Sequence, residues 1–360
     1  MKRLLTLILL FVLGVILPWG CAATSPDGSL TGTGSQNVLN IYNWSSYIDP
    51  QAIAQFEREY NVKINYDTYD SGESMYAKLQ AGNPGYDVVF SPDYMVKIMV
   101  NQGMLQPLDL ARIPNIIHLD PQFANPPYDP GNQYSIPYQW VTLGIGYNID
   151  RVGENINSWS QLFDPNFASR VSLLDDMRHT MGAVLIYLGY DPNTTNQNEI
   201  FAARDFLIQN SSHITAFVPD TGQNLLNQGE VDMTMEYSGD IFQVMQENPR
   251  LRYAIPQEGT IIGMDNMVIP TGAPNPDLAL KFINFIMEPE ISAQISNFIN
   301  YGSPNKTAIA EKLIKPENLA NPGIYPPPEV FAKLRYLEDV GEATIFYDQA
   351  WTEVKLGVGS

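Results

Sequence analysis

Three aspartates occupy positions at which a carboxylate could hold a cation or move a proton. Asp175 and Asp176 follow an apolar run at 171–174 that predicts a strand, and they precede a helix-forming run. Asp265 lies in GMDNMVIP, just before apolar residues that predict another strand. Helix capping favours Asp by about 1 kcal/mol and explains one of the first pair, and an Asx-turn explains Asp265. These local roles, a cation site, and a general acid and base as in a glycosidase all stay open at this point.

The common catalytic motifs that would direct the choice are absent from the sequence. It contains no GxSxG, HExxH or GxGxxG. The three histidines, His118, His179 and His213, are scattered, and the single cysteine, Cys21, lies near the N-terminus. Because a zinc site needs several such ligands at matched spacing, we expect no metal site and no cofactor.

The N-terminus has the pattern of a secretory signal. Two basic residues precede an apolar run at 4–17, which is too short to span a membrane as a helix. Cys21 then stands where a bacterial lipoprotein signal places the cysteine that is lipidated. We therefore expect a signal peptide at 1–20 and a flexible tether at 21–37, rich in Ser, Thr and Gly. The expected location is the periplasm, with a lipid anchor at Cys21; simple secretion is the alternative.

The composition is that of a folded, acidic protein. Hydrophobic residues make up 44% of the 360 residues, charged residues make up 16%, and the formal net charge is −19. Such a chain repels nucleic acid and anionic lipid and attracts cationic ligands. The charge is also explained by solubility alone.

The elements that would position these residues alternate between strand and helix. An alternating run at 38–42 predicts a strand, and Asp49 and Pro50 predict the start of a helix. Trp44 and Tyr47 lie between them. Ligands bind at the carboxyl ends of strands in open α/β sheets, so these rings either face a crevice or only fasten the helix to the sheet.

The same alternation continues along the chain. A strand at 86–91 leads through a loop with Tyr94 into a helix that stops at Gly103, which predicts a parallel sheet. The run at 120–138 is dense in Pro and Asn and predicts a crossing loop. We expect a second α/β region at 141–263 and helices at 275–287 and 290–300.

Ten separate motifs occur in an order that resembles one known family. They are IYNWSSYI, ESMYAKLQAG, YDVVF, YSIPYQW, SWSQLF, SLLDDMR, QGEVDM, MDNMVIP, ALKFINF and YGSPN. Together they resemble the spermidine/putrescine-binding proteins of bacterial ABC importers. The resemblance implies an α/β periplasmic-binding-protein fold of type II, in which two α/β lobes joined by hinge strands close on a ligand cleft. It implies a first lobe at 38–142 plus 267–305 and a second lobe at 143–266 plus 306–360.

The resemblance also implies a ligand site of aromatic walls and carboxylates. Aromatic faces cover the methylenes of a polyamine and attract its ammonium groups, and carboxylates accept charge-assisted hydrogen bonds from them. The implied ligand-binding residues are Trp44, Tyr47, Tyr94, Asp176, His179, Tyr237, Asp265 and Tyr301.

Four positions depart from the pattern of that family. His179 stands where the family has Glu, Tyr237 where it has Trp, Gly263 where it has Trp, and Leu337 where a Gln aligns loosely. Tyr237 still offers an aromatic wall, whereas Gly263 does not. Losing a charged hydrogen bond costs roughly 1.5–3 kcal/mol, so these changes either weaken polyamine binding or mark a different ligand.

The expected function is therefore binding and transport, without catalysis. The protein would capture spermidine or putrescine as a monomer and deliver it to an ABC permease in the inner membrane. One alternative is the same role with another small ligand, such as another amine, an amino acid or a betaine. A more distant alternative is an extracytoplasmic hydrolase that uses Asp176 and Asp265.

Overall fold

The computed structural model describes residues 37–167 and 170–358. The predicted signal peptide, Cys21 and all of the predicted tether except Asn37 lie outside the described residues. The strands are β1 (Val38–Trp44), β2 (Lys63–Tyr69), β3 (Val88–Pro92), β4 (Ser135–Asn148), β5 (Val171–Leu174), β6 (Ile214–Val218), β7 (Met233–Tyr237), β8 (Leu251–Ala254), β9 (Thr260–Val268) and β10 (Leu334–Arg335). They join in the order β2-β1-β3-β9-β4-β7-β5-β6, with β8 on β4 and β10 on β9.

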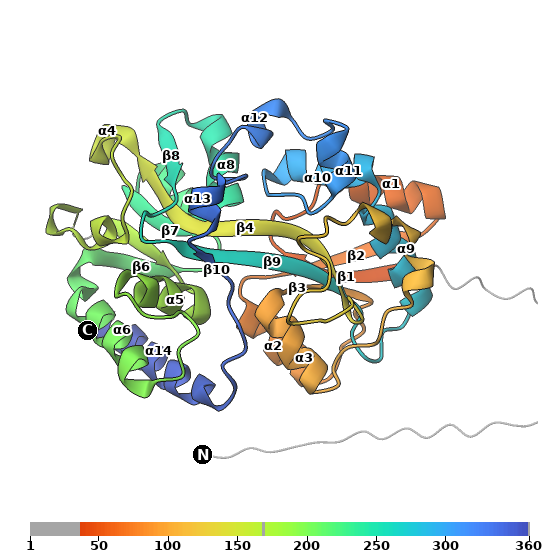
Figure 1. The fold of residues 1–360 in the computed structure, drawn as a ribbon, viewed down its shortest axis with the longest axis horizontal. Coiled ribbons are helices and arrows are strands. Elements are labelled where there is room, and N and C mark those ends of the chain that lie inside the picture. The colour runs from red at the N-terminus through yellow and green to blue at the C-terminus, as the bar shows by residue number, and fades with distance from the viewer. Residues whose placement is uncertain (1–36, 168–169, 359–360) are drawn as a thin grey trace, which may run out of the picture. The chain divides into compact units, whose positions relative to one another are not determined.

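Two groups of parallel strands flank a long antiparallel pair (Figure 1). β1 pairs in parallel with β2 and β3, and β5 pairs in parallel with β6 and β7. β4 and β9 pair with each other; β9 also pairs with β3, and β4 with β7 and β8. We call the part built on β1–β3 the first lobe and the part built on β5–β8 the second lobe. The two lobes are thus joined through β4 and β9.

Helices cover both groups of strands. The α-helices are α1 (Pro50–Tyr60), α2 (Gly72–Gln80), α3 (Asp93–Asn101), α4 (Ile149–Val152), α5 (Met177–Tyr187), α6 (Gln197–Gln209), α7 (Gly222–Gln228), α8 (Ser238–Glu247), α9 (Pro276–Ile286), α10 (Pro289–Ile299), α11 (Lys306–Ala310), α12 (Pro316–Leu319), α13 (Pro328–Phe331) and α14 (Thr344–Val358). Short 3₁₀ helices are η1 (Leu110–Arg112), η2 (Pro114–His118), η3 (Trp159–Phe163), η4 (Pro165–Phe167), η5 (Ser211–His213) and η6 (Gly341–Ala343). In Figure 1, α14 packs beside α5 and α6 on one side of the second lobe, while α8 lies on the other side.

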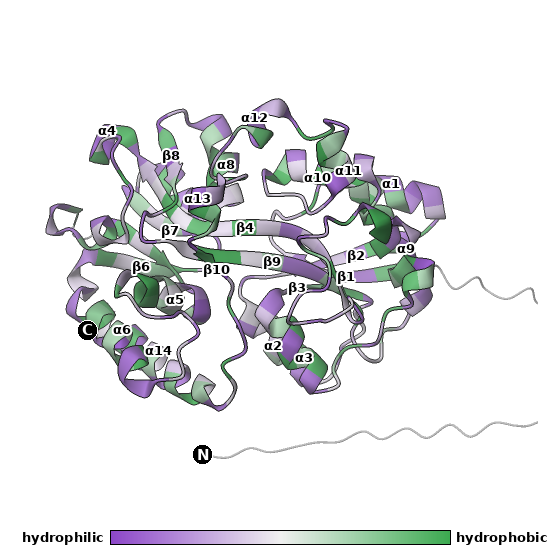
Figure 2. Cartoon of the chain, viewed as in Figure 1, coloured by the Kyte–Doolittle hydropathy of each residue, from purple (hydrophilic) through white to green (hydrophobic). Residues whose placement is uncertain are grey.

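Local sequence signals account for the helix starts. The Asp49 side chain accepts a hydrogen bond from the backbone N–H of Gln51, with Pro50 as the first residue of α1. Asp176 caps α5 in the same way through the N–H of His179. In Figure 2 the helices carry both hydrophilic and hydrophobic residues, as expected where one face lies on a sheet. Within 37–167 and 170–358, no helix is long and apolar enough to cross a membrane.

Four sequence predictions need correction. Trp44 is the last residue of β1, which runs two residues beyond the predicted end of the strand, and Tyr94 lies in the first turn of α3 because β3 leads into that helix without a loop. β4 begins at Ser135, inside the predicted crossing loop, and Asp265 lies within β9. For Trp44, β4 and Asp265, pairing with a neighbouring strand extends regular structure past a polar or Pro-rich run.

Candidate functional site

A cavity lies between the two lobes, against β9. Its empty volume, which includes open solvent at its mouth, is about 460 Å³. Strand ends and the residues after them supply most of its wall, as the crevice rule predicts. The lining residues are Trp44, Ser45, Tyr47, Pro92, Asp93, Val141, His179, Asp220, Tyr237, Asp240, Gly263, Met264, Asp265 and Tyr301.

The cavity brings together six of the eight side chains that the resemblance implies. Trp44 and Tyr47 come from the first lobe, His179 and Tyr237 from the second, Asp265 from β9 and Tyr301 from the segment after α10. Tyr94 and Asp176 are not among its lining residues. Contact of any of the eight with a ligand stays a prediction.

Asp265 accepts hydrogen bonds from two aromatic side chains, one at the end of β1 and one just after it. The Trp44 indole Nε1–H donates to Asp265 Oδ1 at 3.1 Å, and the Tyr47 hydroxyl donates to Oδ2 at 2.8 Å. Burial raises the pKa of Asp265 to about 6, although both hydrogen bonds favour the ionised form. The carboxylate is therefore fixed in position, and His179 is the charged neighbour that favours its ionised form.

Two carboxylates from the second lobe also line the cavity. The Tyr301 hydroxyl donates to Asp240 Oδ2 at 2.6 Å, and the Ser45 hydroxyl donates to Asp220 Oδ2 at 2.9 Å. Burial raises the pKa of Asp240 to about 7 and that of Asp220 to about 8. Sequence reasoning missed both. Asp220 lies two residues after β6 and Asp240 three residues after β7. The rule that ligands bind at the carboxyl ends of strands, applied above to Trp44, would have found them.

Two pairs of aromatic rings line the cavity together with these carboxylates. The ring centroids of Tyr47 and Tyr301 are 4.8 Å apart at 76°, and those of Trp44 and Tyr237 are 6.3 Å apart. The Tyr138 hydroxyl donates to the backbone carbonyl of Tyr47 at 2.7 Å, and this hydrogen bond fixes the loop that carries the Tyr47 ring. Rings arranged in this way can cover methylene groups and attract cations.

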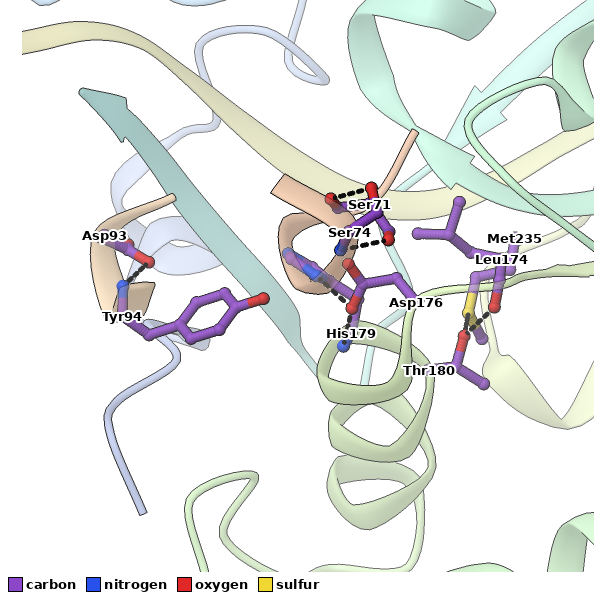
Figure 3. Close-up of polar contacts among 9 residues, drawn as sticks. All are labelled: Ser71, Ser74, Asp93, Tyr94, Leu174, Asp176, His179, Thr180 and Met235. Atoms are coloured by element: carbon purple, nitrogen blue, oxygen red, sulfur yellow. Dashed lines mark hydrogen bonds and ion pairs between the residues drawn. The ribbon is translucent and has the colours of Figure 1, made fainter. Parts of the chain in front are cut away.

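His179 and Asp176 form a buried pair at the start of α5 (Figure 3). Asp176 Oδ1 lies 2.9 Å from both the backbone N and the ring Nδ1 of His179. Burial lowers the pKa of His179, but the carboxylates of Asp176, Asp93 and Glu73 together, with Asp176 foremost, raise it above its usual value. Burial alone would raise the pKa of Asp176, but the charge and hydrogen bonds of His179, together with the charge of Arg178, lower that pKa. The other ring nitrogen, Nε2, faces the space left by Gly263, 4.0 Å from where a Cβ would lie.

Tyr94 and Leu337 line a separate groove outside the cavity. In Figure 3 the Tyr94 ring extends from α3 toward the start of α5; its centroid is 6.4 Å from the His179 ring. Its hydroxyl and Asp176 Oδ2 are buried, and neither has a hydrogen-bond partner within residues 37–167 and 170–358. The groove has an empty volume of about 1060 Å³ and shares Met264 with the cavity.

The electrostatic character of the cavity is predominantly acidic, with His179 as the one side chain of its described lining that can carry a positive charge. Asp93, Asp220, Asp240 and Asp265 line it, and no Lys or Arg of the described chain does. Asp93 accepts hydrogen bonds from two backbone N–H groups, and burial raises its pKa to about 7. Across the described ranges no cluster of three or more His, Cys, Asp or Glu side chains is arranged to hold a metal ion. The arrangement suits an organic cation that donates hydrogen bonds.

Comparison with known proteins agrees with the fold and with the resemblance read from the motifs. Residues 51–322 match the bacterial extracellular solute-binding protein family. A spermidine/putrescine-binding periplasmic protein of Salmonella typhimurium is 36% identical over 89% of this chain and 92% of its own length. A putrescine-binding periplasmic protein of Pseudomonas aeruginosa is 36% identical over 92% and 96%.

A solved structure extends the agreement to three dimensions. The structure of a putative spermidine/putrescine ABC transporter from Listeria monocytogenes has a TM-score of 0.85 and 36% identity, covering 89% of this chain and 99% of its own. The predicted two-lobed periplasmic-binding-protein fold is confirmed, whereas the lobe boundaries stay a prediction. The chain therefore belongs to the bacterial extracellular solute-binding proteins, and it is similar there to those named for spermidine and putrescine.

Proposed function

We propose that this protein captures a polyamine, spermidine or putrescine, between its lobes and delivers it to the permease of an ABC importer. The observation that carries the proposal is a buried cavity with four carboxylates, aromatic walls and no described Lys or Arg in its lining. Burying carboxylates without a countercharge is costly, and a ligand with two or more ammonium groups removes that cost. The names of the relatives support the same ligand class.

The geometry supports a ligand held at two ends. Asp265 stands at one wall with Trp44 and Tyr47, and Asp240 stands at another with Tyr301. The Tyr47 and Tyr301 rings meet between the two carboxylates. A short chain of methylenes would lie against these rings while its terminal ammonium groups reach the carboxylates.

The rest of the proposal follows from the transport role. The protein would act without catalysis, because a polyamine is held by hydrogen bonds and ring contacts alone. It would work in the periplasm as a monomer that docks on its permease, with Cys21 as the lipid anchor. None of these steps needs a cofactor.

Another small amine is the second candidate, and one observation favours it. Gly263 leaves the cavity without a ring at that position, and His179 Nε2 faces the space. A neutral imidazole nitrogen can accept a hydrogen bond from an amine, so the site can suit a ligand of different length or branching.

Calorimetric titration tests the proposal. Purified protein carrying Cys21→Ser, which blocks lipidation, is titrated with putrescine, spermidine and spermine at pH 7.5. Micromolar or tighter binding of one of them, lost in Asp265→Ala and kept in Asp150→Ala, supports the proposal; Asp150 is exposed, lies in α4 beyond the end of β4, and is not among the lining residues of the cavity. Absence of heat with all three polyamines would refute it, and other amines, amino acids and betaines would be titrated next.

A further inference from the structure

Asp220 differs from the other cavity carboxylates in what surrounds it. It lies in the turn between β6 and α7, and its side chain is only 6% exposed. Among the described residues, the side chain that donates a hydrogen bond to it is the uncharged Ser45 hydroxyl of the first lobe. Asp265, by comparison, accepts from two side chains.

The charged groups that face Asp220 are all carboxylates. Asp240 approaches it from α8 and Asp70 from the turn between β2 and α2, and both raise its pKa. Glu236 lies behind it in β7, fully buried, and accepts hydrogen bonds from the backbone N–H groups of Gly222 and Tyr237. Three acidic groups thus surround a fourth, with no basic side chain of the described ranges among the causes of its altered titration.

Such a cluster can be stabilised in two ways: its carboxyl groups keep their protons, or a cation binds among them. Like charges in a buried site suppress one another's ionisation, so a group keeps its proton when nothing positive is present. A cation in the cavity reverses this, because it favours the ionised form. The pKa of Asp220, raised to about 8 by burial and by Asp240, agrees with the first state for the empty cavity.

We infer that Asp220 is a ligand-contacting carboxylate that carries a proton in the empty, closed site and releases it to solvent when an ammonium group of the ligand enters. The neutral acid and the Ser45 hydroxyl then hold the two lobes together without ligand. The ionised form accepts a charge-assisted hydrogen bond from the ammonium group. This inference rests on the proposed function, since it requires a cationic ligand in the same cavity.

Calorimetry in two buffers of different ionisation enthalpy tests it at pH 7 with putrescine and spermidine. The dependence of the observed heat on the buffer gives the number of protons released on binding. We expect the wild-type protein to release protons and Asp220→Asn to release about one fewer. The affinity of Asp220→Asn should fall at least about tenfold at pH 8.5, where the wild-type carboxyl is ionised, and by less at pH 6.

The outcomes separate this inference from the proposed function. Binding with no proton release, or with the same release in Asp220→Asn, overturns the inference and leaves the polyamine function standing. No binding of either amine overturns both. Asp150→Asn is the matched control, an exposed carboxylate of the same lobe paired with Arg250, and its proton release should equal that of the wild type.

A second measurement avoids dependence on the variant. Infrared difference spectra of the wild-type protein should show a protonated-carboxyl band that disappears when putrescine is added. If Asp220→Asn folds, as judged by circular dichroism, the lost band should shrink in that variant. An unchanged carboxyl region on binding in the wild type would contradict the inference.

Discussion

Asp265→Asn should stabilise the unliganded protein and weaken its binding of the ligand. Ionising a buried carboxyl whose pKa is about 6, rather than the 3.8 of an ordinary Asp, costs the folded state about 3 kcal/mol at pH 7 and above. Asparagine removes that cost. Its amide oxygen can still accept from the Trp44 indole, but the Tyr47 hydroxyl loses its acceptor, at about 1 kcal/mol. The expected net gain is about 2 kcal/mol.

The sign of the pH dependence follows from proton binding. Between pH 3.8 and about 6 the folded state holds a proton on Asp265 that the unfolded state has lost, so this group makes wild-type stability fall as the pH rises through that window. Below pH 3.8 the carboxyl is protonated in both states and contributes no penalty. The stability difference between variant and wild type should therefore grow from pH 4 to pH 7.

The assay is thermal unfolding of dialysed, ligand-free protein at several pH values, followed by titration with putrescine. We expect Asp265→Asn to melt several degrees higher at pH 7, with the advantage lost near pH 4, and to bind putrescine at least about tenfold more weakly. Asp150→Asn, at an exposed position, should change neither. A lower melting temperature for Asp265→Asn at pH 7 would refute the reasoning, because the lost hydrogen bond would then outweigh the buried charge.

Three further predictions concern neighbouring groups. Protonation of His179 places a second cation beside the ligand, and Asp176 raises the pKa of His179 above its usual value. Polyamine affinity should therefore fall as the ring takes up a proton at lower pH, and part of that fall should be absent in His179→Gln; an identical titration curve for that variant would place the ring outside the site. Trp44→Phe removes the indole donor to the buried carboxylate and should weaken binding about three- to tenfold; a calorimetric affinity equal to that of the wild type would contradict the contact. Gly239→Ala puts a Cβ 1.7 Å from the Tyr301 ring, so it should cost about 1–3 kcal/mol in urea unfolding and weaken binding; unchanged stability would contradict this packing.

The sequence predicts the elements well where local signals and periodicity agree. The cap at Asp49 and the proline after it mark the start of α1, as the structure has it. Prediction fails where pairing with a distant strand decides the outcome. Asp265 looks like a turn residue in sequence, yet β9 pairs with β3 and β4 on its two sides and keeps that residue in a strand. No local signal reports those partners.

The candidate site shows the same limit in a different form. Asp176 looks like a cap and is one, and its capping oxygen also binds the His179 ring, which no spacing rule predicts. Sequence reasoning misses Asp220 and Asp240 because each resembles an ordinary polar residue after a strand. Only the folded chain brings them beside Asp265, more than 20 residues away in sequence.

The net charge illustrates how the structure turns an undecided observation into evidence. A charge of −19 is compatible with solubility alone, because carboxylates on the surface cost little. Four carboxylates inside one cavity are different, since burial raises the pKa of each and no Lys or Arg of the described residues lines the cavity with them. Burying these carboxylates costs the unliganded protein free energy. A bound cation removes that cost, and the free energy recovered contributes to the affinity for the ligand.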